Sequence, residues 1–329
     1  MIPDPISIEK CPPEYDSFRD EELDGQLRAK AKTELREDAG SRDAALAQIR
    51  EFIAKHPQIV RCRTDVMFLL RFLRMRKFNV VEACNFLELG LTAIAKHPEC
   101  FQVRDSVEEM NRFIRAGVIV PLGYNRDDQL VVLYRVAAVD TSWMTPAEII
   151  KYAYVTVQVL GEDNRFQIGG VELIFDIGGT SMAYVGMWKL SDLNLLFVSA
   201  DTALPARIKK VHVAPLVPLA VMFSNLCMGI ISTKMRERVV FHKSIDDLKA
   251  AIDESVLPDI YGGKQSLEEA NERFRQKVLE QRERILKHAE MTIDLSIPNP
   301  NSKNPANAAL QSSVVDESVI GSFRKLNVD

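Results

Sequence analysis

The sequence lacks an excess of charge of either sign. Its 42 Lys and Arg residues are balanced by 46 Asp and Glu residues, which gives a formal net charge of −4 at pH 7. Because proteins that bind nucleic acid depend on a basic surface, this balance excludes such binding through overall charge, and any anion site must be local. Cysteine is sparse, and Cys11, Cys62, Cys84, Cys100 and Cys227 show no CxxC or other metal-ligand spacing. This odd, dispersed set predicts free thiols in a reducing compartment and no metal site.

The common signatures of enzymes are also missing. The chain contains no GxGxxG, GxxxxGK[ST], GxSxG or HExxH motif. The loop 176–181, DIGGTS, resembles the phosphate loop of actin-like ATPases, but a helical pattern follows it and no second Asp-Gly loop occurs downstream. We interpret the loop as a glycine turn that leaves a buried strand. The histidines lack ligand or triad spacing, and His212, between two valines, is predicted to be a satisfied sheet histidine.

The first ten residues, MIPDPISIEK, include two prolines, two acids and no apolar run. Such a start does not have the apolar core of a secretory signal. We therefore expect a cytoplasmic protein.

One long stretch carries no charge. From residue 211 to residue 233 no side chain is formally charged, when His212 is counted as neutral, and Lys234, Arg236 and Arg238 follow at once. The part of this stretch that is compatible with a helix runs only from about Leu219 to Ile231, which is too short to cross a hydrocarbon core about 30 Å thick.

The apolar residues of this stretch repeat at helical spacing. One face is formed by Leu219, Met222, Phe223, Leu226 and Ile230. The opposite face carries Ser, Asn, Cys and Met in place of charges. Two interpretations stay open: a core helix covered by its neighbours, or a lid that covers an apolar space when closed and touches a bilayer when open.

Sequence patterns divide the chain into four segments. They are an arm rich in Pro and acids over 1–42, a helical subdomain over 43–115, an alternation of strands and helices over 116–280, and a helix end with a polar tail over 281–329. Within the third segment, strands are predicted at 129–136, 170–177, 209–215 and 237–244. Such alternation predicts an α/β fold with a mainly parallel sheet and crossover helices.

Basic residues form three local clusters. They are Arg71, Arg74, Arg76 and Lys77; Arg207, Lys209 and Lys210; and Lys234, Arg236 and Arg238. Any one of them alone is typical of a solvated face. Two of them, however, flank the uncharged stretch. An apolar helix with cations at its ends suits an anionic membrane surface, where each Lys or Arg contributes about 1 kcal/mol to binding.

Five ordered motifs resemble the CRAL-TRIO lipid-binding family, whose members include tocopherol-transfer and retinaldehyde-binding proteins. They are TDVMFLLRFLRMRKFNVVEA (64–83), VELIFDIGG (171–179), LPARIKKVHVAPLVPLAVMFS (204–224), KMRERVVFH (234–242) and LPDIYGG (257–263). The resemblance covers about residues 43–280, and the closing GSFRKLNVD is similar to the end of insect members. It implies an α/β CRAL-TRIO domain, whose sheet floors an apolar cavity under a gate helix, behind a small all-α subdomain.

The resemblance also implies roles for particular positions. The lipid pocket would be lined by Ala153, Val157, Ile174, Phe175, Thr180, Met182, Leu219 and Phe223. The gate would include Pro215, Leu219, Met222, Phe223, Leu226 and Ile230. A phosphoinositide would be bound by Arg74, Arg207, Lys234 and Arg238. The chain departs from the family pattern at 178–180, Gly-Gly-Thr, where many relatives have Glu-Gly-Trp. This departure leaves the identity of the lipid open.

The expected function is intracellular binding and transfer of a small hydrophobic lipid between membranes, with gate opening assisted by a phosphoinositide. The cargo would be tocopherol-, retinoid- or carotenoid-like. The alternatives are exchange of a phosphatidylinositol-type phospholipid and a lipid-sensing scaffold on the same fold. We expect no enzymatic activity, no cofactor besides the bound lipid and no nucleic-acid partner. The protein would be a monomer that associates peripherally with phosphoinositide-containing membranes.

Overall fold

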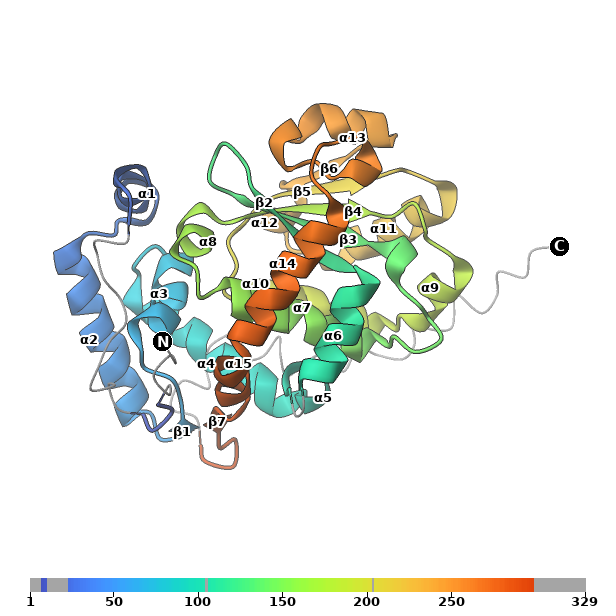
Figure 1. Cartoon of the computed structure of the whole chain (residues 1–329). Helices are drawn as coiled ribbons and strands as arrows, with labels where there is room; N and C mark the ends of the chain where they lie inside the picture. Colours follow the sequence, from blue (N-terminus) through green and yellow to red (C-terminus); the bar gives the residue numbers. More distant parts are fainter. Residues whose placement is uncertain (1–6, 11–22, 104–105, 203, 299–329) are drawn as a thin grey trace.

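A five-stranded sheet forms the centre of the structure, a computed structural model that describes residues 7–10, 23–103, 106–202 and 204–298 (Figure 1). The strands follow the order β2-β3-β4-β5-β6, with bounds β2 Ile119–Tyr124, β3 Leu130–Arg135, β4 Val171–Asp176, β5 Ile208–Ala214 and β6 Val239–Phe241. β2 pairs antiparallel with β3, and the other pairs are parallel. The predicted α/β fold with a mainly parallel sheet is therefore confirmed.

The sequence-based prediction did not include β2. Its sequence, IVPLGY, contains Pro121 and Gly123, two residues that usually indicate a turn. The structure places them on an edge strand with a shift of register between them, where proline is tolerated.

Crossover helices connect the parallel strands. α7 (Pro146–Leu160) and α8 (Asn164–Gly169) lie between β3 and β4, α9 (Met182–Met187) and α10 (Leu190–Thr202) between β4 and β5, and α11 (Pro218–Ile230) and α12 (Thr233–Arg236) between β5 and β6. α7 begins where the sequence predicts a helix, because Thr145 and Glu148 form a capping box and Pro146 occupies the first turn. After β6 come α13 (Ile245–Ala251), the short 3₁₀ helices η4 (Glu254–Val256) and η5 (Asp259–Tyr261), α14 (Leu267–Glu280) and α15 (Arg282–Ala289).

The two faces of the sheet bury different helices. Ile174 of β4 packs in a core that includes Leu248 and Ile252, on and just after α13, and Ala270 of α14. Leu173, its neighbour in the strand, packs instead with the side of the sheet that α7, α10 and α11 cover. Successive residues of a strand point to opposite faces, so this alternation assigns every strand residue to one side.

A separate helical core packs against this domain. It is formed mainly by α2 (Ala39–Lys55), α3 (Val66–Met75) and α4 (Val80–Lys96). α5 (Pro98–Phe101) and α6 (Ser106–Ala116) place Phe101, Met110 and Phe113 in the core of the sheet domain instead. The core of the sheet domain therefore includes side chains of α5 and α6, two helices within the predicted helical segment 43–115.

Segments predicted to be irregular contain ordered elements. Met291 and Ile293 pack in the helical core, and β7 (Thr292–Ile293) pairs with β1 (Ile59–Arg61). Ordered structure therefore continues beyond α15 within the segment 281–329, which was predicted to be a helix end with a polar tail. Residues 299–329, with the closing GSFRKLNVD, lie outside the described residues.

The predicted N-terminal arm over 1–42 also contains helices. α1 (Gly25–Lys30) continues into a π-helix, η2 (Ala31–Leu35), and α2 begins at Ala39. The prediction of an irregular arm overlooked apolar residues that recur every fourth position. Their side chains pack against Ile168 of α8; they are Leu23, Leu27, Ala31 and Leu35. Residues 1–6 and 11–22 of the arm lie outside the described residues.

No single helix within the described ranges is both long and apolar enough to cross a membrane. α3 and α4 reach that length and composition only together, across a bend of 111°.

One buried carboxylate joins the helical subdomain to the sheet domain. Glu162, after α7, accepts hydrogen bonds from Arg63 at 2.9 Å, from Arg71, and from Arg284 of α15 at 2.8 Å. Burial acts to raise the pKa of Glu162, but the three guanidinium groups outweigh it and hold the pKa well below the ordinary value of 4.5. The carboxylate therefore stabilises the fold above that value, and its contribution is lost as the pH falls through the lower, folded-state pKa.

Replacing this carboxylate should destabilise the protein strongly. We expect Glu162→Gln to lower the free energy of unfolding by about 3 kcal/mol, because it removes the carboxylate that pairs with the fully buried Arg71, although Arg63 keeps Asp65. Urea unfolding followed by circular dichroism would measure the change. The control is Glu272→Gln, which removes an exposed ion pair with Arg275 and should change the free energy of unfolding far less. Equal stability of the two variants would contradict the role of Glu162 as a buried joint.

Candidate functional site

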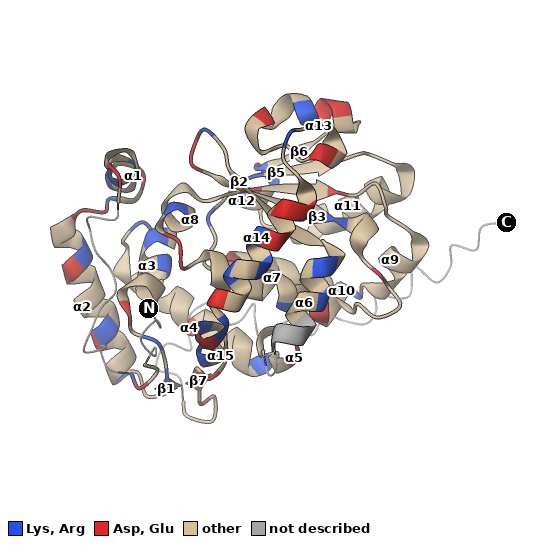
Figure 2. Ribbon diagram, in the orientation of Figure 1, with Lys and Arg blue, Asp and Glu red and all other residues tan. Residues whose placement is uncertain are grey.

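Helix α11 is apolar and yet largely uncovered. All 13 of its residues are described, none is charged, and Ala220 alone is buried. Val221 and Met222 are 36% and 46% exposed. Figure 2 shows charged residues along α13 and α14, as is usual for helices that face water on one side. The interpretation of α11 as a core helix covered by its neighbours is therefore wrong in this conformation.

The inner side of α11 packs on the sheet through an apolar cluster. Ala220 is buried there with Val211 and Val213 of β5, and Phe223 packs against the same cluster. The ring of Phe223 meets that of Tyr184 of α9 edge to face, at a centroid distance of 5.7 Å. The predicted apolar face of the helix is thus rotated: Ala220 and Phe223 face the sheet, whereas Met222 faces solvent.

Several predicted pocket residues come together beneath α11. Phe175 of β4 packs in the same cluster as Phe223. Ala153 and Val157, one helical turn apart on α7, are half-buried against the adjoining core. Residues such as Leu173 belong to the borders of both clusters and connect them. In the structure, the predicted pocket residues of β4, α7 and α11 therefore lie on the same side of the sheet.

Ile174 does not belong to this group. It is fully buried on the opposite face of β4, under α13. Because Phe175 points toward α11, its neighbour Ile174 must point away, and the prediction that both line one pocket is wrong.

The other predicted pocket and gate positions lie at the rim. Thr180 is half-buried, and its hydroxyl donates to the Ile177 carbonyl at 2.7 Å. Met182, the first residue of α9, is 70% exposed. The remaining positions are half-buried; they are Pro215, Leu219, Leu226 and Ile230.

Solvent reaches the sheet beneath α11. Leu173 and Phe175 lie on β4, which has a strand on each side, and both are only half-buried. A closely packed core would bury side chains at the middle of a sheet. The partial exposure indicates loose packing between the sheet and the helices above it.

The loop 176–181 is a glycine turn, as predicted. The amide of Gly178 donates to the Asp176 carboxylate at 3.0 Å. A Cβ atom at Gly179 would lie 2.4 Å from the Cα of Ala137, so no larger residue fits at this position.

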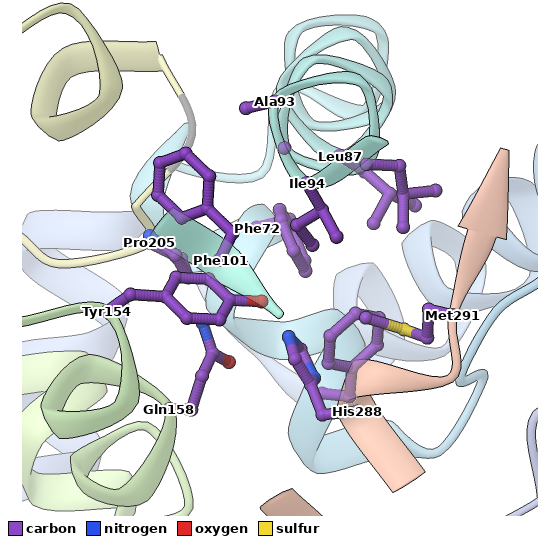
Figure 3. Close-up of a pocket in the computed structure, with 13 residues that line it drawn as sticks. Phe72, Leu87, Ala93, Ile94, Phe101, Tyr154, Gln158, Pro205, His288 and Met291 are labelled. Carbon is purple, nitrogen blue, oxygen red and sulfur yellow. The ribbon is translucent and has the colours of Figure 1, made fainter. Parts of the chain in front are cut away.

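A small pocket lies away from α11, between α3, α4, α7 and α15 (Figure 3). Its volume is about 20 Å³, enough for a single water molecule and far too small for a lipid. The Tyr154 hydroxyl and His288 Nδ1 are buried without a hydrogen-bond partner among the described residues. Sequence patterns gave no signal for this pocket, because its lining comes from segments far apart in the chain.

The predicted phosphoinositide-binding residues lie in different environments. Arg74 is fully buried; Glu37 accepts from it at 2.8 and 2.7 Å, and Asn164 and Gln167 each accept at 2.8 Å. Its guanidinium group therefore faces a protein carboxylate rather than solvent. We leave Arg74 out of the basic set considered below.

The remaining basic residues lie around the start of β5. Arg207 and Lys209 both donate to Glu34, at 3.0 and 2.7 Å. Arg238 donates to the Ile208 carbonyl, and Lys234 on α12 is exposed. Burial is the main cause that lowers the pKa of Arg207, and the positive charge of nearby Arg238 adds to it. Lys209 is the residue of this group that the predicted site did not include, although it lay in the same sequence cluster.

His212 is satisfied within the sheet, as predicted. Its Nε2 lies 2.8 Å from Glu172, and its Nδ1 lies 2.7 Å from Nε2 of His242. Asn125 donates to the other Glu172 oxygen at 2.8 Å. These contacts satisfy His212 within the fold.

Part of the chain matches a known family of domains. Residues 114–263 match the family described as CRAL/TRIO domain. Clavesin-1 of Xenopus laevis is 28% identical over 254 residues, which cover 73% of this chain and 74% of that protein. Clavesin-2 of Homo sapiens is 25% identical over 247 residues, which cover 73% and 75%. The solved structure of Sfh5 aligns with 79% of this chain and 98% of its own, at 11% identity and a TM-score of 0.41.

The family match includes the strands of the central sheet and α11. The clavesin matches extend the likeness over most of the chain. Residues 114–263 therefore form a domain of the CRAL/TRIO type, and most of the chain is similar to the clavesins.

Proposed function

We propose that this protein binds a small hydrophobic lipid between its sheet and α11 and transfers it between membranes, with α11 as the gate. The observation that carries the proposal is the environment of α11: 13 residues without charge, of which Ala220 alone is buried. A helix held permanently in a core would be covered on most sides. A helix that faces water in one state and lipid in another needs an uncharged outer surface.

The energetics favour a carrier of this kind. A lipid with about 15 buried carbons loses ~12 kcal/mol when it passes from a bilayer into water, at about 0.8 kcal/mol per CH₂ group. Unassisted exchange is therefore slow. Apolar side chains such as Phe175, Val157 and Phe223 offer the hydrocarbon an apolar environment other than the bilayer. The protein then needs to make and break no covalent bond, and we propose no catalytic step and no cofactor.

The outer side of α11 supports contact with a membrane. Val221 and Met222 are exposed on it, and Lys234 and Arg236 follow on the exposed α12. Apolar side chains beside cations are typical of helices that lie in the headgroup region of anionic membranes. We propose peripheral, transient docking on phosphoinositide-containing membranes from the cytoplasmic side, through Lys234, Arg238, Arg207 and Lys209.

The lipid cargo can be identified directly. We expect the protein, purified from a eukaryotic host without detergent, to carry an organic-extractable lipid that mass spectrometry identifies. A terpenoid alcohol, aldehyde or hydrocarbon supports the small-lipid proposal. A phosphatidylinositol species supports phospholipid exchange instead, and an extract free of lipid contradicts both.

The gate can be tested on its outer surface. We expect Met222→Glu to slow transfer of a fluorescent lipid between vesicles about tenfold, because a buried methionine stabilises membrane contact by about 1.5–3 kcal/mol and a carboxylate does not. Binding of the same lipid by the protein alone should be unchanged, since Met222 faces away from the sheet. The matched control is Val81→Glu, on the exposed start of α4. Equal slowing of transfer by both variants would contradict the proposal that α11 is the gate.

The basic residues near the gate give a second test. We expect Lys234→Glu combined with Arg238→Glu to weaken binding to phosphoinositide vesicles by about tenfold or more, at about 1 kcal/mol per cation. Sedimentation with vesicles of phosphatidylcholine, with and without phosphatidylinositol bisphosphate, would measure it. Lys264→Glu, an exposed lysine after η5, is the control. The proposal of phosphoinositide docking fails if the double variant and the control bind alike.

A further inference from the structure

An acidic side chain of the N-terminal segment already occupies the basic residues at the start of β5. Glu34 accepts from Arg207 Nη2 at 3.0 Å and from Lys209 Nζ at 2.7 Å, both through the same oxygen, Oε2. Burial acts to raise the pKa of Glu34, but the hydrogen bonds and charges of Lys209 and Arg207 outweigh it and lower that pKa. Two cations therefore converge on one anionic oxygen, which is the arrangement that a phosphate oxygen requires.

The backbone that presents Glu34 is unusual. Glu34 lies in η2, a π-helix, and π-turns are rare and frequently occur at functional sites. The next residue after η2, Arg36, has a φ of 64°, in the left-handed region that only glycine adopts without cost. Such a conformation is retained where surrounding contacts fix it. Here the fixed point is Glu37, which is fully buried between Arg74 and Arg42.

The part of the segment before this point combines a buried apolar stripe with polar contacts that reach solvent. Its apolar stripe, Leu23, Leu27, Ala31 and Leu35, packs against Ile168. Lys30 donates to the backbone carbonyl of Asp127, and this contact is exposed. The Glu34 side chain is 36% exposed, against 0% for Glu37. Residues 25–35 are thus anchored by Glu37 and by the buried stripe, whereas the polar contacts of Lys30 and Glu34 reach solvent.

We propose that residues 25–35 form an internal cover of the anion site, in which the Glu34 carboxylate holds Arg207 and Lys209 until a membrane phosphate displaces it. This inference rests on the phosphoinositide docking proposed above and adds a competing ligand within the chain. Displacement turns the Glu34 side chain away from the cations, while the buried stripe and the pairing of Glu37 with Arg74 stay intact.

Charge favours the phosphate in this competition. A phosphate monoester carries about −1.5 to −2 charges near neutral pH, whereas a carboxylate carries one. The phosphate also offers three acceptor oxygens, and Arg238 lies close enough to Arg207 for its charge to act there. Headgroups of lower charge, such as that of phosphatidylserine, gain less binding free energy when they displace Glu34. The cover therefore raises the selectivity of the site for multiply charged headgroups.

The main test is Glu34→Gln, which keeps the size of the side chain and removes its charge. We expect it to bind soluble inositol trisphosphate, and vesicles that contain phosphatidylinositol bisphosphate, about fivefold more tightly than the unmodified protein, a gain of about 1 kcal/mol. The control is Glu51→Gln, which makes the same change of charge in an exposed ion pair of α2 with Lys55. Calorimetry and vesicle sedimentation would measure the two affinities.

A second variant tests the cover without touching the charges. Leu27→Ala shortens the apolar stripe, and we expect it to tighten headgroup binding in the same direction. Hydrogen exchange at residues 27–35 should rise in both variants, and should rise in the unmodified protein when inositol trisphosphate is added.

The outcomes separate this inference from the proposed docking. If the unmodified protein binds the headgroup and Glu34→Gln binds it equally, the cover is wrong and the docking site stands. If neither protein binds the headgroup or the vesicles, the docking proposal itself is wrong. Tighter binding by the Glu51→Gln control to the same extent shows a general effect of charge and also overturns the cover.

Discussion

The alternation of side chains along β4 and β5 is the constraint on which the rest of the structure depends. A strand sends successive residues to opposite faces, so Phe175 and Val213 must face α11 while Ile174 and His212 face the other side. One face therefore carries a conventional packed core under α13 and α14. The other face ends in half-buried apolar side chains beneath a helix without charges. Lipid binding is proposed for the second face alone, because the first has no loosely packed surface to offer.

Charge in this protein acts through local pairs rather than through an overall field. The chain is nearly balanced in charge, and three carboxylates pair with particular cations: Glu162 at the joint between domains, Glu37 with Arg74, and Glu34 with Arg207 and Lys209. The degree of burial separates their roles. The first two pairs are buried and hold the fold together, since an unpaired charge there would be costly. The Glu34 pairs reach solvent, so an incoming anion can compete for the same cations.

The gate and the anion site are connected through the order of the chain. β5 begins at the cations that Glu34 covers and ends at α11, and α12 then returns the chain to Arg238 beside the start of β5. A phosphate bound at these cations would therefore contact both ends of the segment that contains the proposed gate. This connection gives a physical route by which the membrane headgroup can favour an open helix, since a ligand shifts an equilibrium only by binding one state better than the other.

The sequence alone determined the elements that depend on local pattern: the parallel strands with their crossover helices, the glycine turn at 178–179, the satisfied His212, and the uncharged helix followed by cations. Spacing, capping and the motifs of the CRAL-TRIO family were sufficient for these, because each is encoded within a short window. The tertiary structure decided which faces meet. It rotated the inner face of α11 toward Ala220, placed Ile174 on the far side of the sheet, buried Arg74 against Glu37, and brought Glu34 to Arg207 across 173 positions of sequence. Such pairings depend on how distant segments pack, and no local pattern of residues contains that information.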